Sequence, residues 1–340
     1  MKKMGKLIIH IGAHKTGSTA IQKFFFDYHK YFEENYELVY PVKDQVEPAY
    51  GYWGHHYLTW YFSPPPPEGE ILVDLNILKM AFQSFMNVVS KNKKYVLISS
   101  EDLIWNNKKE EFITHVKGFF DEIIVIMYVR KQVEAALSLY QTGVVNHGYT
   151  KSFNEWFDEA KILFDYYAIA NCWENLGCKV IVKPFIRDKF ESKDVILDFL
   201  NTVSQIIERK ISVPSEYKPN SIRVNISVPD FITMMIRYSN SQPSKDKVVP
   251  VLREFGLKLI ELMPDLPKHD FVPASVKKNI LEVYKESNRL LCEKYLGLEY
   301  LDWLNQEIYE DDEVFYQRFG YPGSQLVELA KVVLQIVEKL

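Results

Sequence analysis

The chain has 340 residues, of which 47% are hydrophobic and 25% are charged, a composition typical of globular proteins and not of disordered or fibrous ones. Lysine and arginine number 41 against 45 acidic residues, so the formal charge is −4 and no basic excess is available to bind nucleic acid over a wide face. Three cysteines without a CxxC pair argue against a disulfide framework and against a structural zinc site.

The apolar runs are too short for a membrane span or a signal peptide. The longest, Ile123–Val129, has the length of a strand, whereas a bilayer span needs about 20 residues. The basic start Met1–Lys6 is followed by a short apolar run that His10 interrupts. We therefore expect a soluble cytoplasmic protein.

Five short apolar segments predict the strands of a sheet. They are rich in β-branched residues and lack polar alternation, the pattern of parallel strands covered on both faces. Longer helix-like segments separate them, as in α/β proteins. The first of these carries an apolar stripe at helical spacing, from about Thr19 to Phe32. The predicted strands are Lys6–Ile11, Glu37–Tyr40, Tyr95–Ser99, Ile123–Val129 and Lys179–Lys183.

Two further stretches differ from this alternation. Pro41–Gly69 is loop-rich and contains the proline run Pro64–Pro67, which fits neither a regular helix nor a central strand. Long irregular loops in compact domains are usually functional or disordered. Beyond about Pro214 the pattern predicts only helices, over Pro229–Tyr238, Lys247–Met263, Ser275–Tyr295 and Ser324–Leu340.

Together these patterns predict a three-layer α/β sandwich with a mostly parallel central sheet and a helical C-terminal part. Residues 1–215 form the predicted core, and residues 216–340 form a helical extension packed on it within one structural domain. The apolar face between Val327 and Val337 suits packing on the body of the protein or the seam of a homodimer.

A glycine-containing loop, Gly12–Thr19, lies between the first predicted strand and the first predicted helix. In this place successive backbone N–H groups and a helix N-terminus can hold a phosphate. A nucleoside-triphosphatase loop would read GxxxxGK[ST], with an acidic residue on another strand for Mg²⁺. Here Lys15 comes two residues before Gly17, and the strands ending near Ser99 and Val129 lead into Ser-Ser-Glu and Arg-Lys. The sequence predicts a phosphate site without a catalytic metal.

Ile9–Gln22 resembles the 5′-phosphosulfate loop of the sulfotransferases that use 3′-phosphoadenosine 5′-phosphosulfate (PAPS), especially bacterial members with the pattern HKTGST.IQ. Arg130 and Ser138 resemble the family's 3′-phosphate site, and a guanidinium with a hydroxyl suits a terminal phosphate. The likeness covers roughly residues 6–205. The Arg-Lys-Gly segment of many animal cytosolic members is not found. The resemblance implies a P-loop NTPase-like fold, PAPS as cofactor and 3′-phosphoadenosine 5′-phosphate (PAP) as product.

The resemblance also implies which residues bind the cofactor. Lys15 is expected to stabilise the charge that develops at the leaving phosphate during sulfuryl transfer. His10 and His14 flank the loop, and packing or backbone hydrogen bonds are the favoured roles for both. The predicted cofactor-binding residues are His14, Lys15, Thr16, Gly17, Ser18, Thr19, Arg130 and Ser138.

An acceptor hydroxyl must lose a proton as it attacks, which requires a general base. His55 and His56 follow Gly54 in a loop that can lie over the strand ends, where ligands bind in open α/β sheets. We expect His55 to be the base, because His55-x-x-Leu58 resembles the bacterial pattern, with His56 second. Glu101, just past the third predicted strand, is the third candidate, or it caps the following helix.

Aromatic residues crowd the segment beside these bases, and they suit a sugar ring or a flat phenol as well as core packing. They are Tyr50, Tyr52, Trp53, Tyr57, Trp60, Tyr61 and Phe62. Bacterial relatives imply a small-molecule or glycan acceptor, such as a hydroxyl of a carbohydrate, glycolipid or secondary metabolite. Two alternatives remain: a P-loop kinase or NTPase that requires Mg²⁺, and a non-catalytic nucleotide-binding module that would tolerate loss of Lys15 or the histidines.

Overall fold

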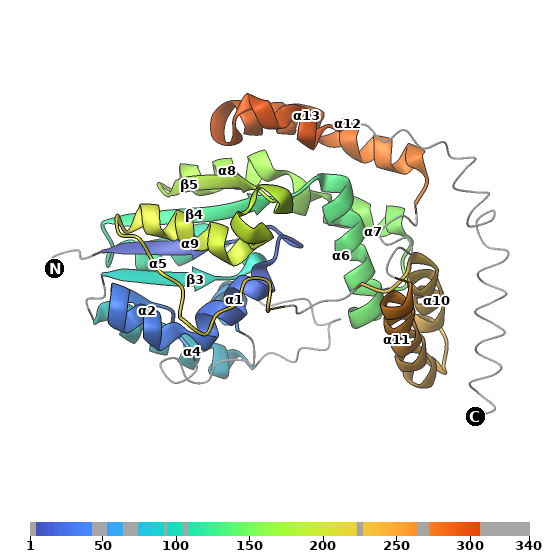
Figure 1. Ribbon diagram of the computed structural model, residues 1–340, viewed down its shortest axis with the longest axis horizontal. Helices are drawn as coiled ribbons and strands as arrows, with labels where there is room; N and C mark the ends of the chain where they lie inside the picture. Colours follow the sequence, from blue (N-terminus) through green and yellow to red (C-terminus); the bar gives the residue numbers. More distant parts are fainter. Residues whose placement is uncertain are drawn as a thin grey trace. The chain divides into compact units, whose positions relative to one another are not determined.

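The computed structural model describes residues 5–42, 53–63, 74–91, 94–104, 108–222, 227–263 and 272–306 (Figure 1). The chain forms two compact units, each of which is described by itself. The first comprises Met1–Arg130, Asp165–Val224 and Leu290–Tyr300. The second comprises Lys131–Phe164, Asn225–Arg289 and Leu301–Leu340.

The first unit contains a five-stranded parallel sheet in the order β2-β3-β1-β4-β5. Its strands are β1 (Lys6–His10), β2 (Leu38–Val39), β3 (Tyr95–Ser99), β4 (Glu122–Val129) and β5 (Lys179–Pro184). The predicted α/β class and parallel sheet are confirmed. Because all strands run the same way, the carboxyl ends of β1, β3 and β4 meet at one edge of the sheet.

Helices cover both faces of this sheet. On one face α1 (Ser18–Asp27), α2 (His29–Tyr36) and α9 (Val195–Ile206) pack on Ile8, Leu97 and Ile126 (Figure 1). The alternate residues Leu7 and Ile9 are also fully buried, which is the burial expected of parallel strands. The other helical segments of this unit are α3 (His56–Phe62), α4 (Leu75–Ser90), η1 (Glu101–Ile104), α5 (Lys109–Val116), α8 (Tyr166–Asn175), η3 (Arg187–Lys189), η4 (Glu191–Lys193), η5 (Cys292–Leu296) and η6 (Leu298–Tyr300).

The helix predicted from Thr19 onward is two helices. Helix α1 (Ser18–Asp27) ends at Tyr28, whose φ of −111° is not helical, and α2 (His29–Tyr36) follows at once. The break lets Phe32 pack on Phe24 and Phe25, with ring centroids 5.6 and 4.7 Å apart. All three rings are fully buried. The helical spacing of apolar residues therefore continues from α1 into α2, and the sequence pattern does not indicate the break at Tyr28.

The second unit is helical throughout its described residues. It contains α6 (Gln132–His147), α7 (Phe153–Ala160), η2 (Lys161–Phe164), α10 (Asp230–Asn240), α11 (Lys245–Leu262), most of α12 (Ala274–Leu291) and α13 (Leu301–Leu304). Its core includes Tyr140, Phe157, Ile232 and Ile280. Helices α10, α11 and α12 are close to the predicted ones, whereas the helix predicted over Ser324–Leu340 lies outside the described residues.

The domain boundary predicted at residue 215 stays a prediction, although Lys131–Phe164, which that division assigns to the core, belongs to the second unit. Within the described ranges, no helix is both long and apolar enough to cross a membrane.

Candidate active site

The predicted phosphate loop connects β1 to α1 and is anchored to β4. The backbone N–H of Ala13 donates to the carbonyl of Tyr128 at 2.7 Å, and the N–H of Tyr128 donates to the carbonyl of Gly12 at 2.6 Å. Thr16 Oγ1 donates to the carbonyl of Ala13 at 2.6 Å and closes the loop on itself. Gly17 has a φ of 84°, and a side chain there would also press on Val195. This position therefore requires glycine.

The curled loop presents a set of backbone donors. No acceptor among the described residues pairs with the backbone N–H groups of Thr16, Gly17, Ser18 or Thr19. They lie at the start of α1, where a helix has no internal acceptors and carries partial positive charge. Such a donor set fits a phosphate. A phosphate group therefore fits the residues present.

Two cations border the loop. Arg130, at the end of β4, donates from Nη1 to the carbonyl of Lys15 at 3.4 Å. Burial lowers the pKa of Lys15, the charge of Arg130 lowers it further, and Glu101 opposes both. Two positive charges beside a nest of N–H donors are suited to a ligand that carries negative charge. Ser138 is buried in α6 of the second unit, so its pairing with Arg130 stays a prediction.

His55 is locked into the backbone. It precedes α3 and is 1% exposed. Its Nδ1 accepts the backbone N–H of Ser99 at 3.1 Å, and Nε2 lies 2.9 Å from the carbonyl of Pro41, to which it must donate. Burial, only partly offset by these bonds, lowers the pKa of His55 to about 4. A neutral ring with both nitrogens engaged is poorly suited to be a base, contrary to the expectation from sequence.

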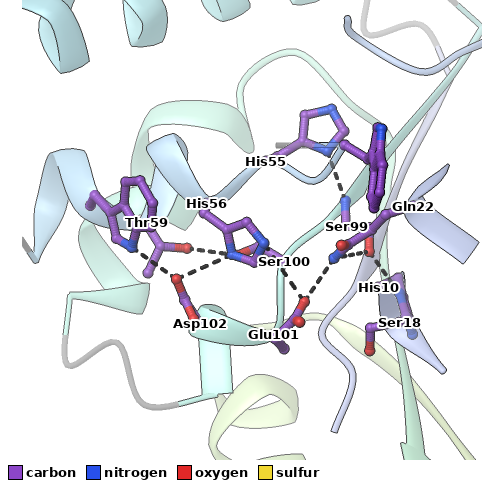
Figure 2. A network of polar contacts seen from close by, with 12 residues as sticks. His10, Ser18, Gln22, His55, His56, Thr59, Ser99, Ser100, Glu101 and Asp102 are labelled. Carbon is purple, nitrogen blue, oxygen red and sulfur yellow. Dashed lines mark hydrogen bonds and ion pairs between the residues drawn. The ribbon is translucent and has the colours of Figure 1, made fainter. Parts of the chain in front are cut away.

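His56 opens helix α3, so its ring diverges from that of His55 and points toward two carboxylates (Figure 2). Its Nδ1 lies 3.1 Å from Asp102 Oδ2 and 3.1 Å from Ser100 Oγ. Its Nε2 lies 3.9 Å from Glu101 Oε2. Burial acts to lower the pKa of His56, but the hydrogen bond to Asp102 and the two negative charges outweigh it and raise the pKa to about 9.

Trp60, one helical turn after His56, completes this arrangement. Its indole Nε1 donates to Asp102 Oδ2 at 2.8 Å, and its ring stacks on the imidazole with centroids 5.8 Å apart. Burial acts to raise the pKa of Asp102, but the hydrogen bond and charge of His56 lower it overall. Asp102 thus remains ionised and fixes the orientation of the imidazole, which is the arrangement of a histidine base and its orienting acid.

Glu101 lies between this pair and the phosphate loop. A Cβ built on Gly12 would be 3.2 Å from Glu101 Cβ, so the carboxylate segment is packed against the loop. Gln22 Nε2 donates to Glu101 Oε2 at 2.7 Å and to Ser99 Oγ at 3.2 Å. Ser99 Oγ in turn lies 2.8 Å from His10 Nδ1. The sequence predicts no role for Ser99 or Asp102, and it includes Gln22 only as the last residue of the loop pattern. An acidic pair directly after a predicted strand was a usable signal for Asp102.

The predicted aromatic cluster is mostly core. Tyr57, Trp60 and Phe62 are buried, and Tyr61 stacks on Phe82 of α4 with ring centroids 4.6 Å apart. Trp53 receives the Nζ of Lys23 over its ring at 5.1 Å. Tyr50 and Tyr52 lie outside the described residues. Trp60 contacts the candidate base, His56.

Within the part of the chain that the structure describes, no group of three or more His, Cys, Asp or Glu side chains is arranged to hold a metal ion.

No protein-family model matches the chain, and no curated protein matches it. Among solved structures, a sulfotransferase from Alicyclobacillus acidocaldarius is similar at 14% identity, covering 74% of this chain and 100% of that one, with a TM-score of 0.40. A likeness at this level does not establish a family, so we base the functional proposal on the chain's own residues.

Proposed function

We propose that the chain is a PAPS-dependent sulfotransferase that moves a sulfonate group to an acceptor hydroxyl. The observation that carries the proposal is the loop Gly12–Thr19, with backbone donors that no described acceptor satisfies and with Lys15 and Arg130 beside it. A histidine oriented by a carboxylate stands at the same edge of the sheet. Phosphate binding and proton removal are the two tasks that this reaction requires of a protein.

The loop residues divide the first task between them. Bound PAPS supplies a sulfonate attached to a phosphate leaving group. The N–H groups of Thr16–Thr19 hold the 5′-phosphate, and Lys15 neutralises the charge that grows on its bridging oxygen as the sulfur–oxygen bond breaks. Arg130 is the proposed ligand of the 3′-phosphate, for which a planar guanidinium is well suited. His14 remains a proposed loop contact, and burial lowers its pKa so that it is neutral at pH 7.

For the second task we assign His56 as the base. Asp102 holds Nδ1–H, which leaves Nε2 as the atom that takes the acceptor proton. As the acceptor oxygen bonds to sulfur, its proton passes to Nε2, and the resulting imidazolium is stabilised by Asp102 and Glu101. The proposed acceptor is a hydroxyl of a carbohydrate, glycolipid or secondary metabolite.

The kinase alternative would require a carboxylate committed to Mg²⁺. Asp102 accepts hydrogen bonds from His56 and Trp60, and Glu101 accepts one from Gln22. Both carboxylates after β3 are therefore engaged by the network around the proposed base, which favours sulfuryl transfer over Mg²⁺-dependent phosphoryl transfer.

The dependence of activity on pH tests this assignment. His56 must be neutral to accept a proton, and its pKa in the free protein is about 9. We expect kcat/KM for sulfonate transfer to phenol and sugar acceptors to rise roughly tenfold per pH unit and to level off near pH 9. Asp102→Asn removes the group that raises this pKa, so the bend should move to lower pH. Activity that instead falls above pH 9 would show that the imidazolium is required and that Glu101 is the base.

A further inference from the structure

Gln22 links the helix that carries the phosphate loop to the carboxylate beside His56. It lies on α1, one turn after Ser18, and is 3% exposed. Its Nε2 donates to Glu101 Oε2 at 2.7 Å and to Ser99 Oγ at 3.2 Å (Figure 2). A carboxylate can only accept, so the amide nitrogen must face Glu101. The contact therefore fixes both the position and the orientation of the Gln22 amide.

Further hydrogen bonds hold the Gln22 amide on the side of Ser99. Ser99 Oγ accepts from Gln22, and the same oxygen lies 2.8 Å from His10 Nδ1. Burial lowers the pKa of His10 to about 4, which keeps its ring neutral. All of these side chains except Glu101 are fully enclosed. The hydrogen bond to buried Ser99 thus fixes the Gln22 amide, so the amide does not move together with Glu101.

The distance between Glu101 and His56 is unusual for such a pair. Glu101 Oε2 stands 3.9 Å from His56 Nε2, whereas an unrestrained carboxylate and imidazolium would close to about 2.8 Å. The oxygen held back is the one that Gln22 binds at 2.7 Å. A single hydroxyl oxygen can lie within hydrogen-bond distance of two atoms 3.9 Å apart. The charged and titratable groups that face His56 include Asp102 and Glu101 after β3, His14 of the phosphate loop and the neighbouring His55.

We propose that Gln22 is a positioning residue that holds Glu101 away from His56 and thereby keeps the Nε2 atom accessible to the acceptor hydroxyl. This inference rests on the proposed function, because it places the oxygen of the acceptor hydroxyl between His56 Nε2 and Glu101 Oε2. Through its side-chain amide, Gln22 also links helix α1, which begins at the phosphate loop, to Glu101 beside the proposed base.

Gly54 offers a second, independent way to displace this amide. A Cβ built on Gly54 would lie 2.7 Å from Gln22 Cδ and 2.8 Å from Nε2. Alanine at this position must push aside the far end of the Gln22 side chain while leaving the amide chemically intact. Gly118 is the matched control, because a Cβ there meets nothing within 4 Å.

The test compares Gln22→Met, Gly54→Ala and Gly118→Ala with the wild-type chain. The pKa of His56 is followed by NMR titration of its imidazole proton, without nucleotide or acceptor. In Gln22→Met and Gly54→Ala we expect Glu101 to close on Nε2, so that this pKa rises above its wild-type value of about 9. We expect kcat to fall on the order of tenfold to a hundredfold, while PAP affinity and KM for PAPS change less than about twofold, since the loop donors are untouched. Gly118→Ala should match wild type in every respect.

The two readouts separate failure of this inference from failure of the proposed function. A raised His56 pKa in a chain that binds no PAP would support the positioning role and overturn the sulfotransferase. Normal PAP binding with an unchanged His56 pKa and unchanged kcat in Gln22→Met would overturn the positioning role alone. Should Gln22→Met fail to fold, Gly54→Ala gives the same decision, because its backbone change is small and its clash is with the end of a side chain and not with backbone.

Discussion

Replacing Lys15 by alanine should lower kcat for sulfonate transfer about a thousandfold, the cost of removing a preorganised charge from a developing oxyanion. Lys15 stands in the loop whose backbone donors would bind the 5′-phosphate, and it is largely withdrawn from solvent. The donors of Thr16–Thr19 remain in the variant, so PAP affinity should fall much less, by about tenfold. Turnover is measured as PAP release under saturating PAPS, and affinity by calorimetry.

The matched control for this change is Lys179→Ala. Lys179 begins β5 at the other end of the sheet and is exposed, with a long ion pair of 3.9 Å to Glu122. Its removal should leave turnover within about twofold of wild type, because exposed ion pairs of this kind contribute little. Retention of more than a tenth of wild-type turnover in Lys15→Ala would contradict the role given to Lys15.

Substitution of His56 should lower turnover, whereas substitution of the adjacent His55 should lower the stability of the fold. His56→Asn should lower kcat about a thousandfold, within the range for loss of a general base, and should abolish the rise of activity toward pH 9. The folded structure should tolerate the change, because the asparagine amide can still donate to Asp102 from the start of α3. Steady-state kinetics between pH 6 and pH 10 measure both effects.

His55→Gln is the companion variant, and its cost should be stability. Glutamine can donate to the carbonyl of Pro41 as Nε2 does, but the backbone N–H of Ser99 loses its acceptor. A buried donor left unpaired costs about 1–3 kcal/mol. We expect urea unfolding to show a loss of this size while kcat changes less than about threefold. A thousandfold loss of kcat in His55→Gln, with His56→Asn active, would reverse the assignment of the base.

The sheet could be predicted from sequence because its strands carry a strong local signal. All five predicted strands match observed strands to within a residue or two at each end, since continuous β-branched runs such as Ile123–Val129 have few other stable arrangements. The break at Tyr28 could not be predicted in this way. It depends on how Phe32 packs against Phe24 and Phe25, a tertiary contact that leaves the apolar spacing unchanged.

The candidate site was predictable where a contiguous motif defines it and less so where separate segments meet. The loop Gly12–Thr19 is contiguous and keeps its place between β1 and α1. The choice between His55 and His56 depended on the start of α3 at His56, which turns one ring to the backbone and the other to Asp102. Gln22 is the last residue of the loop pattern, but its contacts could not be predicted, because Ser99 and Glu101 come to lie beside it only when β3 pairs with β1.

Calorimetric titration of the wild-type chain with PAP in EDTA tests the central claim most directly. Parallel titrations use AMP, which lacks the 3′-phosphate, and ATP with and without Mg²⁺, and a further one uses Arg130→Ala with PAP. We expect PAP to bind tightly without a divalent cation, AMP to bind far more weakly, and Arg130→Ala to lose most of the preference for PAP. No binding of PAP, or a preference for Mg²⁺-ATP, would contradict the sulfotransferase assignment and favour a P-loop kinase.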